Sequence, residues 1–504
     1  MSEDDRPFPP GDYPALVVGS GPGGIQLSYD LRRLGVDHAL LSRDEGPGGM
    51  FRRFPMYQRL ITASRPHSPV ERGSAQYFRF DWNSMVTEEP GHQALVTEFM
   101  DGTSYFPARD EMVQGLTTFT ERAGVAARYG CEWQSTRQAD DGRYVLTTSD
   151  GEYTAPVVAF AVGMVSPWTP PTPGIDDVPH YVDLEHRPLE SFAGKSVFVV
   201  GKRNSGFEIA DALLPWARRL IVGSPHPVRP SITTGFPTPP RARYVLPLED
   251  HMFRGGTFVI DVTLDSIERT GEGWRVHAQG TTVPGEYVID VDEVIACTGF
   301  GVEMRDLKKL GVDTFFKDRL PTQTAYWEST TLPGIYFAGA ATQGQAGMRK
   351  YGWPSHSASV GGFRFNAQVQ ARHIAEKHFG IRSEAPLVDP DRAVDYLLEQ
   401  ATWESALWSQ QSNLARALSY ENGTVRDDGI VPLMEFVDAD PSAGLPDAVA
   451  IAVETDREEN TQPAVYIRRG GDVSEHVFEP TWLHDYRTDA NRARLGELLA
   501  RLGG

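Results

Sequence analysis

The distribution of apolar and polar residues along the chain shows the same strand–turn–helix pattern twice. In the first copy the apolar run YPALVV begins at Tyr13, enters the turn GSGPGG, and is followed by IQLSYDLRRLG with helical spacing. A further strand is predicted at 38–41. The second copy begins at Lys195 as KSVFVVGKRNSGFEIADALLP, with its next strand at 219–222. Two such units predict two dinucleotide-binding domains.

The rest of the sequence predicts further sheets, a long loop and a separate C-terminal part. Residues 128–148 and 257–291 alternate apolar and polar positions around DDG and GEG turns, and each stretch leads into an apolar strand, at 156–163 and 293–300. Residues 225–247 are rich in Pro and Gly and predict a long surface excursion. Beyond Ala385 the pattern predicts helices at 391–399 and 404–418, then strands, then a helix at 489–502.

Composition limits the classes of function. The 504 residues fit about three domains. The 48 Lys and Arg against 68 Asp and Glu give a net charge of −20, which disfavours binding to nucleic acid or an anionic membrane. The two cysteines, Cys131 and Cys297, offer no disulfide framework, CxxC pair or metal site. Without a secretory signal or an apolar stretch long enough to span a bilayer, we expect a cytoplasmic chain.

The first turn satisfies the pattern GxGxxG between a strand and a helix. Dinucleotide binding requires three positions that lack a Cβ. One allows the tight turn, one lets the backbone approach the pyrophosphate, and one allows close packing of the helix. An ordinary glycine loop is the alternative. The predicted cofactor contacts here are Gly19, Ser20, Gly21, Pro22, Gly23 and Gly24.

The second turn, GKRNSG, carries Arg203 where the pattern has its middle glycine. A bulky residue there either displaces the cofactor or supplies charge in place of close approach, and a degenerate domain that no longer binds nucleotide is the alternative. Lys202, Arg203, Ser224, His226 and Arg229 form a locally basic set, which favours NADP, with its 2′-phosphate, over NAD. The predicted contacts are Gly201, Lys202, Arg203, Asn204, Ser205, Gly206, Glu208, Ser224 and Arg229.

Several motifs together resemble the class B flavoprotein monooxygenases: GSGPGG, GGMF, AVGMVSPWTPP, GKRNSGFEIA, ACTGF and YFAGAATQG. RRFPMYQRLITASRPH, FDWNSM and GGFRFN are similar to the FAD-dependent oxidoreductases related to the ER flavoprotein associated with degradation, whose bacterial relatives include amine N-monooxygenases. The resemblance covers about residues 13 to 380.

The resemblance implies an α/β fold with two Rossmann-like domains. An FAD-binding domain (1–165 and 290–384) carries an inserted NADPH-binding domain (166–289), followed by a C-terminal extension (385–504). A helix beginning near Gly361 would point its positive end toward the flavin. Ser42 takes the place of the acidic ribose ligand. The other implied cofactor contacts are Arg43, Gly49, Met50, Phe51, Gly163, Thr298, Gly299, Gly339 and Gln343.

Three residues are candidates for the chemistry. Ser64 takes the place of an Asn that lies near the reactive flavin carbon in flavin-containing monooxygenases. Arg52 and Arg65 belong to a group of six arginines. One hypothesis is that some of the six bind an acidic substrate or the nicotinamide nucleotide, and the alternative is that they form a solvated face. The six are Arg52, Arg53, Arg59, Arg65, Arg72 and Arg79. Candidate pocket residues are Tyr351, Trp353 and His356, whereas His180 is interpreted as structural.

We therefore expect a monooxygenase that uses FAD, NADPH and O2, and no metal. Its reduced flavin would form a C4a-hydroperoxide that N-hydroxylates a small amine or amino-acid-like substrate, including carboxylate-bearing amines. Three alternatives stay open: an NADPH-dependent flavin oxidase or reductase without oxygen insertion, Baeyer–Villiger oxygenation, and a flavin-bound scaffold whose NADPH domain is inactive. The oligomeric state is open.

Overall fold

A four-stranded parallel sheet forms around the first strand–turn–helix pattern in the computed structural model, which describes residues 6–229, 242–345, 347, 350–352 and 355–502. The strand order is β18-β7-β2-β3, and every residue of these strands is buried. The strands are β2 (Ala15–Val18), β3 (Ala39–Leu41), β7 (Val157–Phe160) and β18 (Ile335–Phe337). This confirms the first Rossmann-like domain, with strands buried on both faces as a parallel sheet requires.

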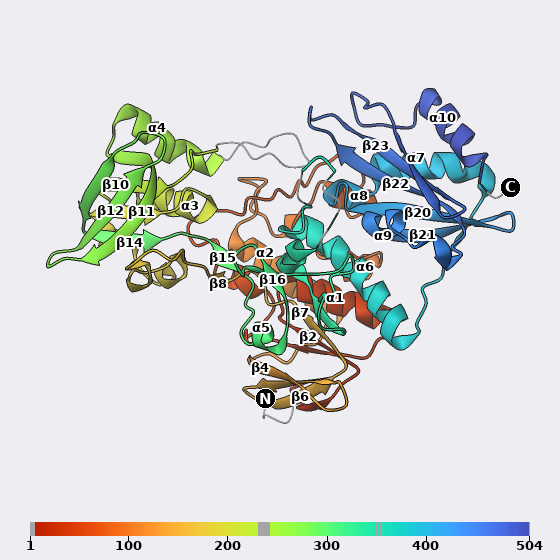
Figure 1. Ribbon diagram of the computed structural model, residues 1–504, viewed down its shortest axis with the longest axis horizontal. Coiled ribbons are helices and arrows are strands. Elements are labelled where there is room, and N and C mark those ends of the chain that lie inside the picture. The colour runs from red at the N-terminus through yellow and green to blue at the C-terminus, as the bar shows by residue number, and fades with distance from the viewer. Residues whose placement is uncertain (1–5, 230–241, 346, 348–349, 353–354, 503–504) are drawn as a thin grey trace. The chain divides into compact units, whose positions relative to one another are not determined.

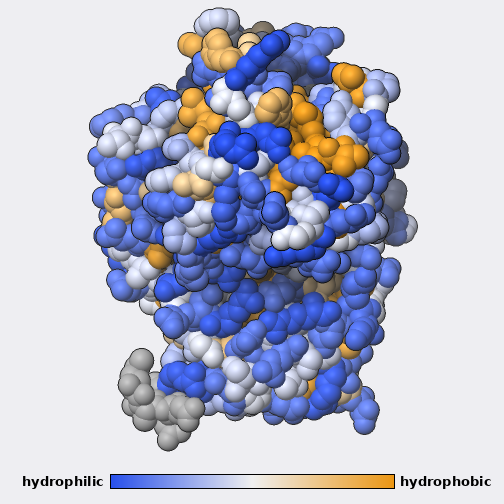
Figure 2. Space-filling model, turned by 90° about the vertical axis from the view of Figure 1, so that its left-hand side faces the viewer, coloured by the Kyte–Doolittle hydropathy of each residue, from blue (hydrophilic) through white to orange (hydrophobic). Residues whose placement is uncertain are grey.

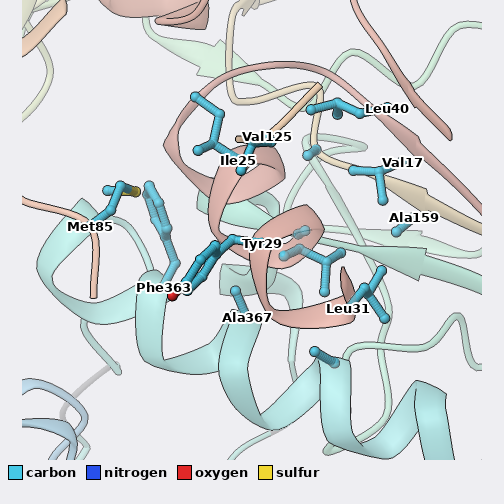
Figure 3. Packing of buried hydrophobic residues seen from close by; sticks show 14 of the residues in the cluster. Val17, Ile25, Tyr29, Leu31, Leu40, Met85, Val125, Ala159, Phe363 and Ala367 are labelled. Carbon is cyan, nitrogen blue, oxygen red and sulfur yellow. The ribbon is translucent and has the colours of Figure 1, made fainter. Parts of the chain in front are cut away.

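Helices α1 (Pro22–Arg33) and α6 (Val360–Phe379) pack against each other beside this sheet. Figure 3 shows Tyr29 of α1 lying against Phe363 and Ala367 of α6, and all three are buried. Helix α2 (Arg109–Ala123) belongs to the same core. The glycine turn at the start of α1 is therefore held between a buried strand and a second buried helix.

Smaller strands and a short helix complete the nucleotide-binding part of the same unit. One sheet has the order β1-β6-β5-β4, and β16 pairs with β17. The bounds are β1 (Gly11–Asp12), β4 (Trp133–Gln138), β5 (Tyr144–Thr148), β6 (Gly151–Ala155), α5 (Leu307–Leu310), β16 (Thr314–Phe315) and β17 (Leu320–Pro321).

The second pattern forms a six-stranded sheet of order β13-β12-β11-β10-β9-β14. Strands β14, β9, β10 and β11 are parallel, and β11, β12 and β13 form antiparallel pairs. The bounds are β9 (Ser196–Val200), α3 (Asn204–Leu213), β10 (Arg219–Ser224), α4 (Val245–Phe253), β11 (Thr257–Arg269), β12 (Trp274–Gly280), β13 (Glu286–Val291) and β14 (Glu293–Ala296); β8 (Ser166–Pro167) pairs with β15 (Phe300–Gly301).

The chain divides into two units, which Figure 1 shows with their elements labelled. Unit 1 comprises Met1–Arg52, Leu60–Met164 and Val302–Gly504, and unit 2 comprises Arg53–Arg59 and Val165–Gly301. Because β14 pairs with β9, the predicted boundary at 290 moves to the junction of 301 and 302. Residues 53–59 also join unit 2 rather than the first domain.

The C-terminal residues build a further six-stranded sheet of order β19-β21-β20-β22-β23-β24 within unit 1. Helices α7 and α10 correspond to the predicted helices at 391–399 and 489–502. The bounds are β19 (Leu387–Val388), α7 (Ala393–Trp403), α8 (Ser405–Ser409), β20 (Leu414–Glu421), β21 (Thr424–Pro432), α9 (Leu433–Val437), β22 (Asp447–Thr455), β23 (Thr461–Arg469), β24 (Asp472–Val477) and α10 (Asp489–Leu499).

The helix predicted at 404–418 is wrong over most of its length. Only Ser405–Ser409 is helical, and the chain then turns through Ser412, whose φ is 57°. Residues 414–421 form β20, because β21 and β22 pair with it on both sides. A short apolar run does not reveal by its periodicity whether it belongs to a buried strand or a buried helix.

The predicted excursion at 225–247 is helical at its end, where α4 begins at Val245, and residues 230–241 lie outside the described residues. Exposed apolar side chains of unit 2 occur on α4 and β11, among them Met252 and Phe253 at 77% exposure. Figure 2 shows an apolar area on an otherwise mostly hydrophilic face. In the part of the chain that the structure describes, no helix has the length and apolar character needed to cross a membrane.

Candidate functional site

Three glycine-bearing segments meet at the start of α1. A Cβ on Gly23 would lie 2.3 Å from the Cα of Gly339, and a Cβ on Gly49 would lie 2.8 Å from the Cα of Gly21. The N-cap of α1 is Gly21, no side chain caps the helix, and Pro22 stands in its first turn. The turn therefore leaves backbone N–H groups for a phosphate, as a pyrophosphate cradle requires. The residues of this cradle fit an FAD pyrophosphate.

Ser42, at the end of β3, is buried beside the glycine turn. The residue is 2% exposed, and its Oγ lies 2.7 Å from the Oγ of Ser20 and accepts the backbone N–H of Asp44 at 3.2 Å. The hydroxyl thus holds the neighbouring turn, and the contact of Ser42 with a ribose stays a prediction. Arg43 is exposed and forms an ion pair with Glu303 at 3.1 Å.

The GGMF turn forms a short 3-10 helix, Gly49–Arg52. Met50 is 36% exposed, whereas Phe51 packs partly against the core beside α1. Arg52 is exposed and folds back over this turn, where its Nη1 donates to the carbonyl of Pro47 at 3.2 Å. The turn thus offers backbone and one exposed apolar side chain next to the cradle.

Ser64 is fully buried in a polar network, and its place beside the reactive flavin carbon stays a prediction. Its Oγ donates to Oδ1 of Asp81 at 2.6 Å and accepts from Nδ2 of Asn83 at 3.0 Å. Ser84 donates to the same Asp81 carboxylate. The Ser64 side chain is 0% exposed, and its hydroxyl is held by Asp81 and Asn83.

Arg364 joins this network to α6. Its guanidinium is 0% exposed and donates to the carbonyls of Phe78 at 2.6 Å, of Asp81 at 2.7 Å, and of Ser84. Burial lowers the pKa of Arg364 to about 10, and the charge of Asp81 opposes this effect. The FDWNSM and GGFRFN motifs are thus two halves of one buried structural contact, a role that sequence reasoning missed.

The arginine-rich segment separates into structural and exposed members. Arg79 lies 3.5 Å from the ring centroid of Trp408 and donates to the carbonyl of Thr402 at 3.0 Å, so it joins the C-terminal part to the rest of unit 1. Arg72 donates to Thr97. Arg65 is exposed, and its side chain has no ion-pair or hydrogen-bond partner among the described residues. Arg52 and Arg65 are therefore two exposed arginines for which no ion pair occurs among the described residues.

The carboxyl end of β18 continues into a 3-10 helix, η10 (Gly339–Gly344). Nε2 of Gln343 donates to the carbonyl of Ala340 at 2.8 Å. Gly163, three residues beyond the end of the neighbouring strand β7, has a φ of 72°. Thr342 accepts from Nδ2 of Asn366 on α6 at 3.1 Å. The residues predicted near the flavin thus share one edge of the parallel sheet with the cradle.

The second turn, in unit 2, has the same close packing as the first. A Cβ on Gly201 would lie 2.3 Å from the carbonyl oxygen of Cys297, and one on Gly206 would lie 2.0 Å from that of Gly201. Arg203 is the exposed N-cap of α3, and no partner of its side chain occurs in the described ranges. A free cation at a helix N-terminus is suited to a phosphate.

Lys202 and Glu208 have partners within the protein, and their contact with a nucleotide stays a prediction. Lys202 is 5% exposed, forms an ion pair with Asp261, and donates to the carbonyl of Ile260 at 2.7 Å. Glu208 is 3% exposed and accepts the backbone N–H of Met56 at 2.8 Å and the hydroxyl of Tyr181 at 3.0 Å. Glu208 therefore explains why residues 53–59 belong to unit 2.

The other predicted contacts of unit 2 lie on its loops and helix start. Ser224 ends β10 and is half-buried, and Arg229 is exposed. The side chain of Asn204, at the start of α3, accepts from the hydroxyl of Tyr244 at 3.1 Å, and Ser205 follows it half-buried. A separate pair of bonds ties Thr298 and Gly299 to Trp168, at 2.6 and 3.0 Å.

The histidines and aromatic residues considered for a pocket differ in their surroundings. The ring of His180 packs edge-on against Phe300, with centroids 5.4 Å apart, and burial lowers its pKa, in keeping with a structural role. His356 is buried, its Nδ1 lies 3.1 Å from the carbonyl of Ser409, and burial lowers its pKa to about 4. Tyr351 is half-buried, and Trp353 lies outside the described residues.

Comparison with known proteins gives a family and a fold. A family model described as pyridine nucleotide-disulphide oxidoreductase matches residues 16–339. FAD-dependent oxidoreductase domain-containing protein 2 of Mus musculus is 26% identical over 448 residues, which span 82% of this chain but only 65% of that relative. More than a third of that relative's length therefore lies outside the matched part.

Two solved structures share the fold. An ornithine N-hydroxylase of Kutzneria sp. 744, whose structure contains reduced FAD, NADP+ and L-ornithine, superposes with a TM-score of 0.54 at 16% identity over 73% of this chain and 100% of its own. A bacillithiol disulfide reductase of Staphylococcus aureus superposes with a TM-score of 0.54 at 15% identity over 73% of this chain and 99% of its own. Similarity at this level establishes the fold of the two nucleotide-binding domains.

Proposed function

Because the chain belongs to the pyridine nucleotide-disulphide oxidoreductase family, we propose that it is an FAD- and NADPH-dependent monooxygenase that N-hydroxylates a small amine or amino-acid-like substrate. The chain is a flavin-dependent oxidoreductase, and its cofactors are FAD and NADP(H). Oxygen insertion, the amine substrate and the roles of individual residues are the parts that this proposal adds.

The observation that carries the proposal is the state of the cysteines. The chain has two, Cys131 in unit 1 and Cys297 in unit 2, and they are 1% and 3% exposed. Burial raises the pKa of both thiols. A dithiol exchanging electrons with a disulfide needs two accessible neighbouring sulfurs and a thiolate. Electrons from the flavin therefore have no protein dithiol to reach, which favours O2 as their acceptor.

The chain's own residues supply binding and orientation. The N-terminus of α1 and the glycines at 19–24 hold the FAD pyrophosphate, and Arg203 at the N-terminus of α3 holds a phosphate of NADPH. Arg65 and Arg52 bind a carboxylate on the amine substrate. When bound, FAD supplies the chemistry that transfers electrons from NADPH to O2. This reaction requires no side-chain nucleophile.

The test uses the purified, FAD-loaded protein. Under anaerobic conditions NADPH is expected to bleach the flavin absorbance, and an unchanged spectrum would refute the proposal in favour of a flavin-bound scaffold. With O2 and a panel of amines, the expected result is a hydroxylamine product in proportion to the NADPH consumed. Hydrogen peroxide equal to the NADPH consumed, with no oxygenated product from any amine, would instead identify a flavin oxidase.

Two matched variants test the arginines. Arg65→Ala is expected to raise KM for an amino acid about tenfold and to leave KM for the amine without the carboxylate unchanged, since a charge-assisted hydrogen bond contributes roughly 1.5–3 kcal/mol when fully formed. Arg137→Ala, at an exposed ion pair with Glu152, is the control. Equal effects of both variants would exclude Arg65 from the substrate site.

A further inference from the structure

A chain of buried hydrogen bonds joins the glycine cradle to the C-terminal part of unit 1. Its first member is Thr342 in η10, which is 1% exposed. The hydroxyl of Thr342 donates to the carbonyl of Gly339 at 2.6 Å. A Cβ on Gly23 would lie 2.3 Å from the Cα of this same Gly339. The hydroxyl of Thr342 therefore holds the turn that abuts the cradle.

The second member is Asn366, which lies in the second turn of α6 and is 0% exposed. Its Nδ2 donates to Oγ1 of Thr342 at 3.1 Å and to Oγ of Ser357 at 2.9 Å. Both N–H groups of the amide are thus used, and Oδ1 is left to accept. Thr342 accepts from Asn366 because its single proton is donated to Gly339, and this fixes the orientation of the Asn366 amide.

The third member is Gln410, which belongs to the C-terminal part. It is the C-cap of α8 and is 0% exposed. Its Nε2 donates to Oδ1 of Asn366 at 2.8 Å and to Oγ of Ser357 at 3.2 Å. A Cβ on Gly362 would lie 3.0 Å from this nitrogen, so a glycine in α6 gives Gln410 the room to reach Asn366.

The chain of hydrogen bonds has one direction, from Gln410 through Asn366 and Thr342 to Gly339. If Gln410 did not donate, Oδ1 of Asn366 would have no donor within the described part of the chain, at a position that water does not reach. Rotation of the amide would then turn Oδ1 toward Thr342, and the hydroxyl would donate to Asn366 instead of Gly339. The turn beside the cradle would lose its hydrogen bond.

We infer that Gln410 is a positioning residue for the flavin, which acts through Asn366 and Thr342 to hold the Gly339 turn against the cradle. The inference rests on the proposed function only for its FAD site, and it needs neither oxygen insertion nor an amine substrate. It gives the C-terminal part of unit 1 a role at the cofactor, which the two glycine turns by themselves do not indicate.

The first test replaces Gln410 by Met, which has a similar volume and no amide. FAD affinity is measured by diluting the FAD-loaded protein and following flavin fluorescence, and the bound flavin is examined by visible circular dichroism and by its midpoint potential. We expect Kd for FAD to rise about tenfold and both properties of the bound flavin to change. A lower melting temperature with an unchanged spectrum and potential would show a merely structural role and overturn the inference.

A second variant and a control accompany this substitution. Gln410→Asn keeps an amide but is one methylene too short to reach Asn366, so it should change the flavin in the same way, and it decides the question if Gln410→Met does not fold. Gln411→Met is the control, because Gln411 is 6% exposed and its Oε1 accepts the hydroxyl of Thr455 at 2.7 Å. The control should keep the FAD affinity and the flavin spectrum. Equal changes in the flavin of Gln410→Met and Gln411→Met would overturn the inference.

A double-mutant cycle tests the path through Thr342. Thr342→Val removes the hydroxyl at nearly constant shape, and we expect it to raise Kd for FAD about tenfold. In that background Gln410→Met should add less than twofold, because the hydrogen bond through which Gln410 acts is already absent. Effects that multiply to about a hundredfold would show that the two residues act independently, and would overturn the inference.

These measurements use no NADPH, O2 or amine, so the inference and the proposed function can fail separately. If the wild type binds FAD and both Gln410 variants keep its affinity and spectrum, the inference is refuted and the proposed function stands. If the variants behave as expected but no amine yields a hydroxylamine, the inference stands and the proposed function is wrong. A wild type that binds no FAD would refute both.

Discussion

Replacing Arg364 by Met should destabilise unit 1 severely although Arg364 touches no proposed ligand. The guanidinium is fully buried and donates to three main-chain carbonyls, those of Phe78, Asp81 and Ser84. Methionine fills much of the same volume but donates no hydrogen bond. The substitution therefore leaves three buried carbonyls unpaired and removes the positive charge beside the buried Asp81 carboxylate.

The size of the effect follows from these lost contacts. Each buried carbonyl left without a partner costs about 1–3 kcal/mol, and removing one member of a buried charged set typically costs about 3–5 kcal/mol. The individual losses are not additive because the three carbonyls belong to one loop. We expect the free energy of unfolding to fall by about 3–5 kcal/mol. At about 2 °C per kcal/mol for a large domain, the melting temperature should fall by at least about 6 °C.

The assay is thermal and urea unfolding of the FAD-loaded protein, followed by circular dichroism and flavin fluorescence. Arg364→Lys keeps the charge but not the planar fork, so its loss should be intermediate. Arg137→Met is the matched control, because Arg137 and Glu152 are 57% and 55% exposed and such pairs contribute about 0–1 kcal/mol. A loss below about 1 kcal/mol for Arg364→Met would refute the reasoning.

Three further substitutions test other parts of the structure. Gly23→Ala places a Cβ 2.3 Å from the Cα of Gly339, so the ratio of flavin to protein absorbance after purification should fall sharply; full FAD content would contradict the close approach. Burial raises the pKa of Asp30 from 3.8 to about 7. The stability that Asp30 contributes is therefore present below about pH 4 and is lost as pH rises through 7. The Asp30→Asn variant should have a higher melting temperature than the wild type at pH 8 and a similar one at pH 4. A difference in melting temperature that does not change with pH would contradict this expectation. Arg203→Ala should raise KM for NADPH about tenfold at low ionic strength, whereas an unchanged KM would assign the nucleotide phosphates to other groups.

The glycine turns and their strands were predictable because their requirements are local. The close approach of Gly23 to Gly339 needs residues without a Cβ, and the sequence displays these residues directly. Strands β2 and β7 are apolar throughout, β9 is apolar after Ser196, and all three are buried throughout, so the residue pattern and the environment agree. The Rossmann-like domains therefore follow from short stretches of sequence without knowledge of their partners.

The roles of the polar residues were much less predictable. Lys202 and Glu208 lie inside or beside a nucleotide-binding motif, yet Asp261 and the main chain of residues 56–57 occupy their side chains. Ser64 occupies a position expected near the flavin, but Asp81 and Asn83 hold it in the interior. Each partner lies 17 or more residues away in the sequence, so a local sequence pattern does not reveal the contact.

By itself, the sequence determined the two Rossmann-like folds, the glycine cradle and the presence of two cysteines, far apart in the chain. Only the tertiary structure decided that residues 414–421 form a strand, that Arg364 joins two motifs more than 270 residues apart, and that several buried side-chain amides have one atom without a hydrogen-bond partner among the described residues. The physical reason is the range of the interactions. Backbone conformation and steric demand are properties of neighbouring residues, whereas the pairing of strands, charges and amides depends on residues that only folding brings together.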